Sequence, residues 1–471
     1  MKIPLNQFDI MTTLHGLKEL EGFMGHDIRE TAVSFDTNRK LTEEELEEVI
    51  KYCTHDVEET MEIFLHRKEE FDSQMALLKA FELPLKYIGK TKAQLAAVIL
   101  KARKMNREDE FDLILPDTLR IKKYSYIVDW YKNPVNHNYE KALETGVSGV
   151  AHVFAWGGLH GARDKYQDEG ILVSLDVSSF YPSLMLEYGF LSRNVEDPKL
   201  YQEIYNERMR LKSLKDPMQQ PYKIVLNSTY GAMKHQYNNL YDPRQANNVC
   251  VGGQLLLLDL IEQLEPHWKL IQSNTDGLIG KIKFKADLTT IKTICKQWEE
   301  RTRMKLDFEL FHKIYQKDVN NYIIIKEDGS YKSKGAYVKK LNSIDNDLPI
   351  VNEALKKHFI NKTPVEDTIY GCKDLMQFQK VVKVSHKYSH ALYGEKSIPE
   401  RTLRVFASRN NDPGVFKVKE SGRIEKIAGT PDSCFIVNDN VIGRRISRRL
   451  DRDWYVNLAK KRLKDYIGKE T

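Results

Sequence analysis

Residues 171–183 read Ile-Leu-Val-Ser-Leu-Asp-Val-Ser-Ser-Phe-Tyr-Pro-Ser. The apolar run that ends at Val177 predicts a short β-strand, and Pro182 suits the first turn of a helix that follows it. This order places Asp176 at the end of a strand, beside a turn and a helix N-terminus whose N–H groups could cradle a phosphate. The alternative interpretation is a strand-ending aspartate that caps the helix.

Downstream of this stretch, residues 196–240 are predicted to form two helices joined by residues 215–221. Pro217 stops the first helix, and Pro221 can start the second. The segment is therefore a predicted helical hairpin.

The hairpin carries basic and polar side chains at helical spacing. Lys223, Asn227 and Tyr230 follow one another at i, i+4 and i+7, which places them on one face of a helix predicted to end at the following glycine. Arg208 and Lys212 are also four residues apart on the first helix. The hairpin could thus aim three cations at one polyanion such as a triphosphate. The alternative interpretation is a solvated basic face.

A second aspartate is predicted at the tip of a β-hairpin. Residues 269–272 and 278–282 are predicted strands, and the turn between them reads Ser-Asn-Thr-Asp-Gly with Asp276 near its end. An ordinary Asp-Gly turn is the alternative. A further hairpin is predicted from strands at 322–326 and 331–338.

The N-terminal third is predicted to be mainly helical. Thr42 caps a run of glutamates that leads into apolar residues at helical spacing. Helical patterns also cover residues 71–104 and 255–264, and we expect a domain boundary near residue 145.

Composition excludes several classes of protein. The 471 residues contain 41% hydrophobic and 30% charged residues, which is typical of a globular chain. The net charge of +6 indicates nucleic acid only where basic residues cluster. Such a cluster occupies residues 441–471, with 10 Lys or Arg against 4 Asp or Glu, and is predicted to end in a basic helix.

The five cysteines are widely spaced, which predicts neither a zinc site nor a disulfide framework. A chain without disulfides is expected in a reducing cytoplasm. No membrane span and no signal peptide is predicted either.

The three polar segments together resemble the family B DNA polymerases. Residues 176–183 match the motif DxxSLYPS with Phe180 in place of leucine, and residues 223–231 match KxxxNSxYG in full. The third motif, DTDS, is matched only as residues 274–277, Asn-Thr-Asp-Gly. In its short-range sequence features, the chain is most similar to bacteriophage or prophage polymerases.

This resemblance implies a two-metal mechanism in which Asp176 and Asp276 bind two Mg²⁺ ions, with Mn²⁺ as the alternative ion. The carboxylate lost at Asn274 is the less essential one in the family. Lys223 is implied as a catalytic residue that protonates the leaving group, and Tyr181 as a steric gate against ribonucleotides. The implied nucleotide-binding residues are Ser179, Phe180, Tyr181, Arg208, Lys212, Lys223, Asn227 and Tyr230.

Two weaker matches concern DNA binding. Lys334 and Tyr337 resemble the family's KxxY element, which holds the primer-template duplex. Gly157 and Gly158 resemble its YxGG element, although Ala155 stands in place of the tyrosine.

Tyr52 and Asp56 fit the third exonuclease motif, YxxxD, but no DxE motif precedes them. Residues 6–9, Asn-Gln-Phe-Asp, are one residue short of the second exonuclease motif. We therefore expect an exonuclease remnant and no autonomous proofreading, from either a truncated gene product or one half of a split polymerase. The short spacings between motifs also disfavour priming by a terminal protein.

The resemblance implies an α+β right-hand polymerase. Its expected parts are an exonuclease remnant at 1–110, a linker and the first part of the palm at 111–194, fingers at 195–240, palm at 241–345, and a thumb with a basic segment at 346–471. Implied partners are primer-template DNA, deoxynucleoside triphosphates and a separate exonuclease-domain chain, in a bacterial host cytoplasm and with no membrane. A catalytically degenerate DNA-binding remnant is the main alternative. A reverse transcriptase or RNA polymerase is disfavoured by the intact KxxxNSxYG motif and by Tyr181.

Overall fold

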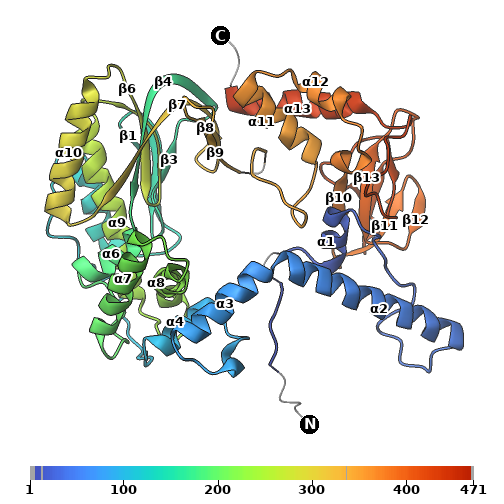
Figure 1. The fold of residues 1–471 in the computed structure, drawn as a ribbon, viewed down its shortest axis with the longest axis horizontal. Helices are drawn as coiled ribbons and strands as arrows, with labels where there is room; N and C mark the ends of the chain where they lie inside the picture. The colour runs from blue at the N-terminus through green and yellow to red at the C-terminus, as the bar shows by residue number, and fades with distance from the viewer. Residues whose placement is uncertain (1–5, 12–13, 336, 468–471) are drawn as a thin grey trace. The chain divides into compact units, whose positions relative to one another are not determined.

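The computed structural model describes residues 6–11, 14–335 and 337–467 (Figure 1). Within these residues the chain forms two compact units. The first unit contains residues 6–8 and 70–332, and the second contains residues 9–69 and 333–467.

The division does not follow the predicted boundary near residue 145, because the N-terminal helix packs on C-terminal strands. Leu20 and Phe23 share an apolar cluster with Val381. The buried Arg404 guanidinium also donates hydrogen bonds to the carbonyl oxygens of Gly22 (3.1 Å) and His26 (2.7 Å). Residues 9–69 are therefore part of the second unit, whereas residues 70–110 belong to the first.

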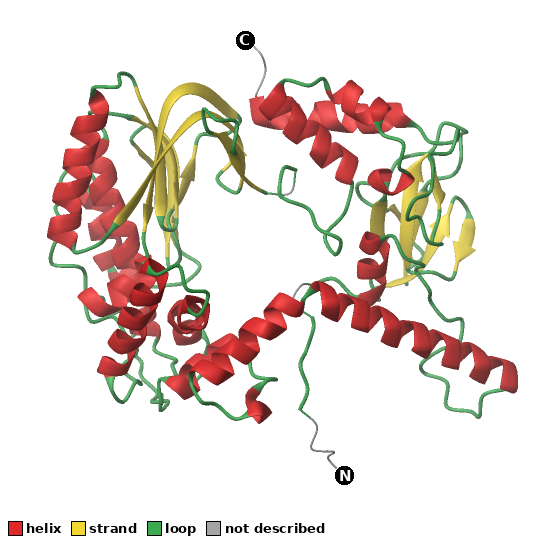
Figure 2. Ribbon diagram, in the orientation of Figure 1, coloured by secondary structure: helices red, strands yellow, loops and turns green. Residues whose placement is uncertain are grey.

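A nine-stranded sheet organises the first unit (Figure 2). Its spatial order is β1-β2-β3-β5-β6-β4-β7-β8-β9, and β4 runs antiparallel to both of its neighbours, β6 and β7. The strands are β1 Ala142–Val147, β2 Val150–Ala155, β3 His160–Ala162, β4 Tyr166–Val177, β5 Lys269–Asn274, β6 Gly277–Ile282, β7 Leu306–Asp318, β8 Asn321–Ile325 and β9 Tyr331–Lys334. Strand β9 ends earlier than predicted because Gly335 adopts a positive φ of 99°.

Eight helices accompany this sheet in the described residues. They are α3 Lys68–Ala80, α4 Lys92–Ile99, α5 Ser125–Lys132, α6 Phe180–Glu187, α7 Pro198–Ser213, α8 Gln219–Lys234, α9 Pro243–Leu264 and α10 Asp287–Thr302. Helices α7 and α8 confirm the predicted helical hairpin. Helix α8 continues past Gly231, because a glycine inside a helix costs only about 1 kcal/mol and the next residues, Ala232 and Met233, are buried.

The two faces of β4 have different surroundings. Val173, Leu175 and Val177 belong to the main apolar core, which they share with the buried leucines of α9. Leu172, on the other face, belongs to a smaller apolar cluster with residues of β5, β6, β7 and β8. Because side chains alternate along a strand, Asp176 shares this second, more open face.

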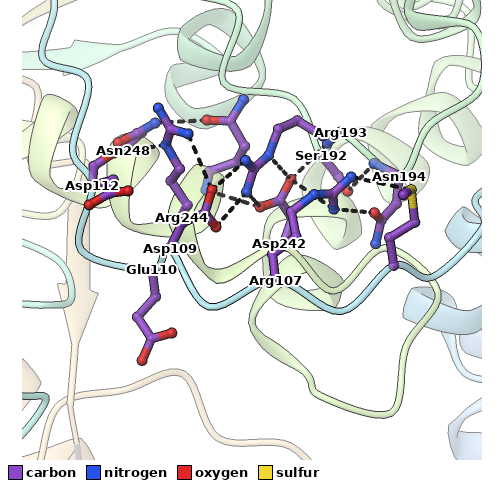
Figure 3. A network of polar contacts seen from close by, with 12 residues as sticks. Arg107, Asp109, Glu110, Asp112, Ser192, Arg193, Asn194, Asp242, Arg244 and Asn248 are labelled. Carbon is purple, nitrogen blue, oxygen red and sulfur yellow. Dashed lines mark hydrogen bonds and ion pairs between the residues drawn. The ribbon is translucent and has the colours of Figure 1, made fainter.

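A network of charged side chains connects the loop before α5 to the loop between α6 and α7 and to the start of α9 (Figure 3). The Arg193 guanidinium donates to both Asp109 (2.6 Å) and the buried Asp242 (2.7 Å). Arg244 also contacts Asp109 (3.2 Å). These two arginines hold the pKa of the Asp109 carboxyl at about 2, so the network stays charged above that pH.

The second unit combines helices with two small sheets. Its helices are α1 Leu17–Met24, α2 Glu43–His66, α11 Pro349–Asn361, α12 Val365–Gly371 and α13 Arg452–Ile467. The strand order is β10-β13-β16 in one sheet and β12-β11-β14-β15 in the other. Their bounds are β10 Lys380–Lys383, β11 Tyr388–Tyr393, β12 Lys396–Ile398, β13 Thr402–Ala407, β14 Val415–Lys419, β15 Ile424–Lys426 and β16 Cys434–Ile436.

The predicted cap of α2 is present, because the Thr42 side chain accepts a hydrogen bond from the backbone N–H of Glu45 (3.2 Å). With its antiparallel sheets and separate helices, the chain has the predicted α+β fold class. Within the described residues, no helix has both the length and the apolar character needed to cross a membrane.

Candidate active site

A cavity of about 600 Å³ in the first unit brings the three polar segments together. Its walls come from the end of β4, the start of α6, the hairpin of α7 and α8, the β5–β6 turn and the start of β7. Its lining includes both predicted metal-binding aspartates and all eight predicted nucleotide-binding residues. These are Asp176, Asp276, Ser179, Phe180, Tyr181, Arg208, Lys212, Lys223, Asn227 and Tyr230.

The antiparallel pairing of β4 with β6 and β7 positions the carboxylates. Asp176 lies opposite Gly277 on one side and opposite Asp307 on the other. The backbone N–H of Val177 donates to the carbonyl oxygen of Asp276 (2.7 Å), which fixes the hairpin tip against the end of β4. Three carboxylates are thereby gathered at the adjoining ends of three strands.

Gly277 makes this approach possible. A Cβ atom at this position would lie 2.9 Å from Asp176 Oδ1 and 3.0 Å from the carbonyl oxygen of Leu175. A larger residue would displace the Asp176 side chain or the strand behind it. The glycine that departs from the DTDS pattern therefore leaves space for the neighbouring carboxylate.

The Asp176 carboxyl has a raised pKa, about 6. The main cause is desolvation by the crowded cavity wall, and the negative charges of Asp276 and Asp307 add to it. Asp176 still contacts solvent, because it faces the cavity. Negative charge is thus concentrated at the strand ends, where it favours a bound cation.

The raised pKa predicts a pH-dependent stability change for Asp176→Asn. Between about pH 4 and 6 the folded wild type binds more protons at Asp176 than the unfolded chain does. The free energy of unfolding of the wild type therefore falls as pH rises through that window. Because Asp176 is exposed to solvent, we expect this loss to be only about 1 kcal/mol. Asp176→Asn should therefore have a free energy of unfolding about 1 kcal/mol above the wild type at pH 7.5 and equal to it near pH 4.

Urea denaturation at both pH values measures this difference. Asp164→Asn, which alters an exposed aspartate in the loop before β4, is the matched control and should leave stability unchanged at both. A gain for Asp176→Asn that is the same at pH 4 and pH 7.5 would contradict the electrostatic explanation.

The turn between β4 and α6 presents Ser179 to an arginine of α7. Ser179 adopts the left-handed conformation (φ 53°, ψ 41°), which is uncommon for a residue with a side chain. Arg208 Nη1 donates to Ser179 Oγ (2.5 Å), and burial lowers the pKa of the Arg208 guanidinium. The buried cation is held at the cavity wall, where an anionic ligand would stabilise it.

Helix α8 presents one face to the cavity, as its spacing predicted. Lys223 and Tyr230 are half-buried and Asn227 is exposed in the lining. The rings of Tyr230 and Tyr181 lie 4.3 Å apart between centroids, and burial raises the pKa of both phenols. This tilted aromatic pair forms a neutral part of the cavity lining.

The predicted glycines have a structural role next to the site. A Cβ atom on Gly158 would lie 2.7 Å from the Thr275 hydroxyl at the hairpin tip, whereas one on Gly157 would meet nothing within 4 Å. Gln254 of α9 donates to the carbonyl oxygen of Gly157 (2.8 Å). Gly158 therefore allows the close approach that positions the Asp276 turn.

The other predicted residues belong to the second unit and do not line this cavity. Lys334 is exposed, and the Arg462 guanidinium lies 4.5 Å from the centroid of the Tyr337 ring. On α2, Tyr52 hydrogen-bonds to Asp56, which also accepts a hydrogen bond from Lys18 (2.5 Å). The Asp56 carboxylate thus shares the Lys18 cation with Glu21, which lies 2.8 Å from the same Nζ atom.

Sequence reasoning missed Asp307 as a part of the site. Its carboxylate accepts a hydrogen bond from the Ser178 hydroxyl (2.6 Å) and lines the cavity beside Asp176. The sequence signal was present, because Asp307 lies at the start of a strand with alternating polar and apolar residues. Only the pairing of β7 with β4 places it next to Asp176.

The donor set fits Mg²⁺. Among the described residues, no group of three or more histidine, cysteine, aspartate or glutamate side chains is placed to hold a metal by itself. Mg²⁺ commonly needs no such cage, since it is bound by one or two carboxylates together with water and substrate phosphates. Asp176 and Asp276, both in the cavity lining, are the carboxylates that would bind it. The pKa of Asp176 is raised mainly by desolvation, and the charges of Asp276 and Asp307 add to this.

Comparisons with known proteins found a similar curated sequence and a similar solved structure. No protein-family model matches the chain. DNA polymerase 1 of Sulfolobus acidocaldarius is 27% identical over 204 residues, which are 43% of this chain and 22% of that protein. The match thus spans about a fifth of the length of that curated relative.

A solved structure of the family B DNA polymerase from the hyperthermophilic archaeon Pyrobaculum calidifontis aligns with 91% of this chain and 57% of its own. The TM-score is 0.48 and the sequence identity 15%.

Proposed function

We propose that this chain is a family B DNA polymerase that adds deoxynucleotides to a primer 3′-OH under the direction of a template. The observation that carries the proposal is a single cavity with two distinct chemical walls. One wall holds Asp176 and Asp276 at adjoining strand ends, and the other holds Arg208 and Lys223 on a helical hairpin. This arrangement suits transfer of a phosphoryl group from a triphosphate, where catalysis rests on positioning and charge stabilisation.

The residues of the cavity divide this work. Asp176 and Asp276 would hold two Mg²⁺ ions, which when bound lower the pKa of the primer 3′-OH and stabilise the leaving pyrophosphate. Arg208, Lys212 and Lys223 would neutralise the triphosphate, and Lys223 would donate a proton to the leaving pyrophosphate.

We extend the proposal to the parts of a right-hand polymerase. We assign the nine-stranded sheet to the palm, α7 and α8 to the fingers, and the residues from 346 onward to the thumb. Lys334 and Tyr337 are proposed to contact primer-template DNA, and the basic C-terminal helix α13 to contact duplex phosphates. Binding should then be salt-sensitive and independent of sequence.

Proofreading is proposed to be absent from this chain. What supports this is the sequence, in which no DxE motif precedes Tyr52 and Asp56; in the structure Asp56 is engaged in an ion pair with Lys18. A separate exonuclease chain and a viral or prophage replication setting complete the proposal.

The test is primer extension on a primed DNA template with Mg²⁺ and the four deoxynucleotides, alongside a labelled-primer digestion without nucleotides. We expect extension without primer shortening. Asp276→Ala controls for a contaminating polymerase and should show none. No extension by the wild type, together with salt-sensitive retention of DNA, would replace this proposal with that of a degenerate DNA-binding remnant.

Tyr181→Ala should relax the discrimination between sugars. The Tyr181 ring packs on Tyr230 at the cavity wall, where it would lie under the sugar and exclude a 2′-hydroxyl. A steric clash of this kind is worth a few kcal/mol, so we expect ribonucleotide incorporation to rise by on the order of 100-fold relative to deoxynucleotide.

Single-nucleotide insertion kinetics with matched ribo- and deoxynucleotides measure this ratio. Tyr181→Phe keeps the ring and is the control that should retain discrimination. An unchanged ratio in Tyr181→Ala would remove Tyr181 as the gate.

A further inference from the structure

Helix α2 carries an exposed apolar face along most of its length. This is the long blue helix of Figure 1, and it spans Glu43–His66. Five of its large apolar side chains are between 50 and 64% exposed, and the exposed Cys53 lies among them. We call these six residues the apolar stripe: Leu46, Ile50, Cys53, Val57, Met61 and Leu65.

The spacing of the stripe is that of a helix face that docks on a partner. Its members follow one another at intervals of three or four residues, which keeps them on one side of the helix. From Leu46 to Leu65 the stripe extends about 29 Å at 1.5 Å per residue. Soluble proteins rarely expose continuous apolar patches of more than a few hundred Å², and larger ones mark interaction sites.

The stripe is not needed to hold α2 in place. Ile63 lies on a different face of the helix and is buried against α1, in the cluster that contains Leu20 and Phe23. Elsewhere along the helix, Glu59 contacts His26 (2.8 Å) and Asp56 contacts Lys18 (2.5 Å). The helix is thus anchored by one side, and the stripe lies on another.

The charged residues of α2 indicate which charges a partner should carry. The helix carries nine Asp or Glu residues and one Lys. Exposed Glu43 and Glu58 lie beside the stripe, and Glu47, also exposed there, is paired with Lys51 (2.6 Å). A second copy of this chain would bring the same acidic border against itself, which disfavours a homodimer through this face. An apolar element bordered by Lys or Arg would complement both the stripe and its edge.

We propose that the apolar stripe of α2 is the docking site for a separate protein, which presents an amphipathic helix whose apolar face is bordered by Lys and Arg. This inference rests on the surface of the second unit and does not depend on polymerase activity. Packing of one amphipathic helix against another uses apolar residues at intervals of three and four on both helices. The basic border would accelerate association and make it sensitive to salt.

Cys53 provides a direct reporter of this docking. Of the other cysteines, Cys250, Cys295 and Cys434 are buried and Cys372 is half-buried. The alkylation rate of Cys53 can therefore be followed in the full chain carrying Cys372→Ser. The probe is a synthetic 25-residue amphipathic peptide with a leucine face bordered by Lys and Arg. We expect it to slow alkylation of Cys53 at least fivefold at low salt and less at high salt.

Two matched peptides separate the two parts of the recognition. A peptide with Glu in place of the Lys and Arg should give no protection, and neither should a scrambled peptide of the same composition that has no apolar face. Ile50→Asp combined with Val57→Asp should abolish protection by the basic peptide. Ile424→Asp changes a comparably exposed apolar residue on β15 and should leave protection intact.

Three results would overturn the proposal. The first is an unchanged alkylation rate of Cys53 at peptide concentrations up to about 100 µM, which would mean that the Kd of the peptide lies well above that concentration. The second is slow alkylation of Cys53 in a dilute solution of the chain without peptide, which would mean that the chain itself covers the stripe. The third is a dimer in sedimentation analysis that Ile50→Asp dissociates, which would make a second copy the occupant.

Discussion

Asp176→Asn should lower the rate of primer extension by on the order of 1,000-fold or more and leave retention of duplex DNA unchanged. The substitution keeps the shape of the side chain and removes the charge at the centre of the three strand ends. Metal ions supply several kcal/mol of transition-state stabilisation, and each 1.4 kcal/mol is a factor of ten in rate. Single-turnover kinetics with saturating DNA measure this loss.

A stability defect does not explain the expected loss, because the same variant should be slightly more stable than the wild type at pH 7.5. The matched control is Asp307→Asn, which removes the same charge from the neighbouring strand. Asp307 is engaged by the Ser178 hydroxyl (2.6 Å), so we expect its loss to cost less than about tenfold. Equal effects of the two substitutions would mean that charge in general, and not the Asp176 carboxylate, supports the reaction.

The local part of this site could be predicted from the sequence, because each segment is defined by short-range rules. The pattern of a strand followed by a helix with proline in its first turn placed Asp176 at the strand end. Helical spacing placed Lys223, Asn227 and Tyr230 on one face of α8. The turn residues located Asp276. Such signals need only the neighbours along the chain.

The parts that could not be predicted depend on contacts between distant segments. Asp307 reaches the cavity through the pairing of β4 with β7, in which it lies opposite Asp176, 131 residues earlier in the sequence. Residues 9–69 join the C-terminal unit through Arg404 and the apolar cluster at Val381. Neither contact has a local signature, and the predicted boundary near residue 145 failed for this reason.

Lys223→Ala should lower the rate of the chemical step by about 100-fold, the typical contribution of a positioned general acid. Lys223 lies half-buried in the cavity lining on α8, on the hairpin that also presents Arg208. Lys223→Arg keeps the charge but holds its proton more tightly, so it should restore nucleotide affinity and not the full rate. Pre-steady-state insertion of one nucleotide separates these two effects as apparent Kd and maximal rate.

The decisive comparison varies the leaving group. A β,γ-dihalomethylene nucleotide releases a less basic leaving group than its β,γ-methylene counterpart and gains less from protonation. The defect of Lys223→Ala should therefore be smaller with the dihalomethylene nucleotide, whereas a purely electrostatic role would give the same defect with both. Lys212→Ala removes an exposed cation from the same cavity and should cost less than about tenfold, with no dependence on the leaving group. A Lys223→Arg variant that turns over as fast as the wild type would exclude Lys223 as the proton donor and leave it as a phosphate ligand.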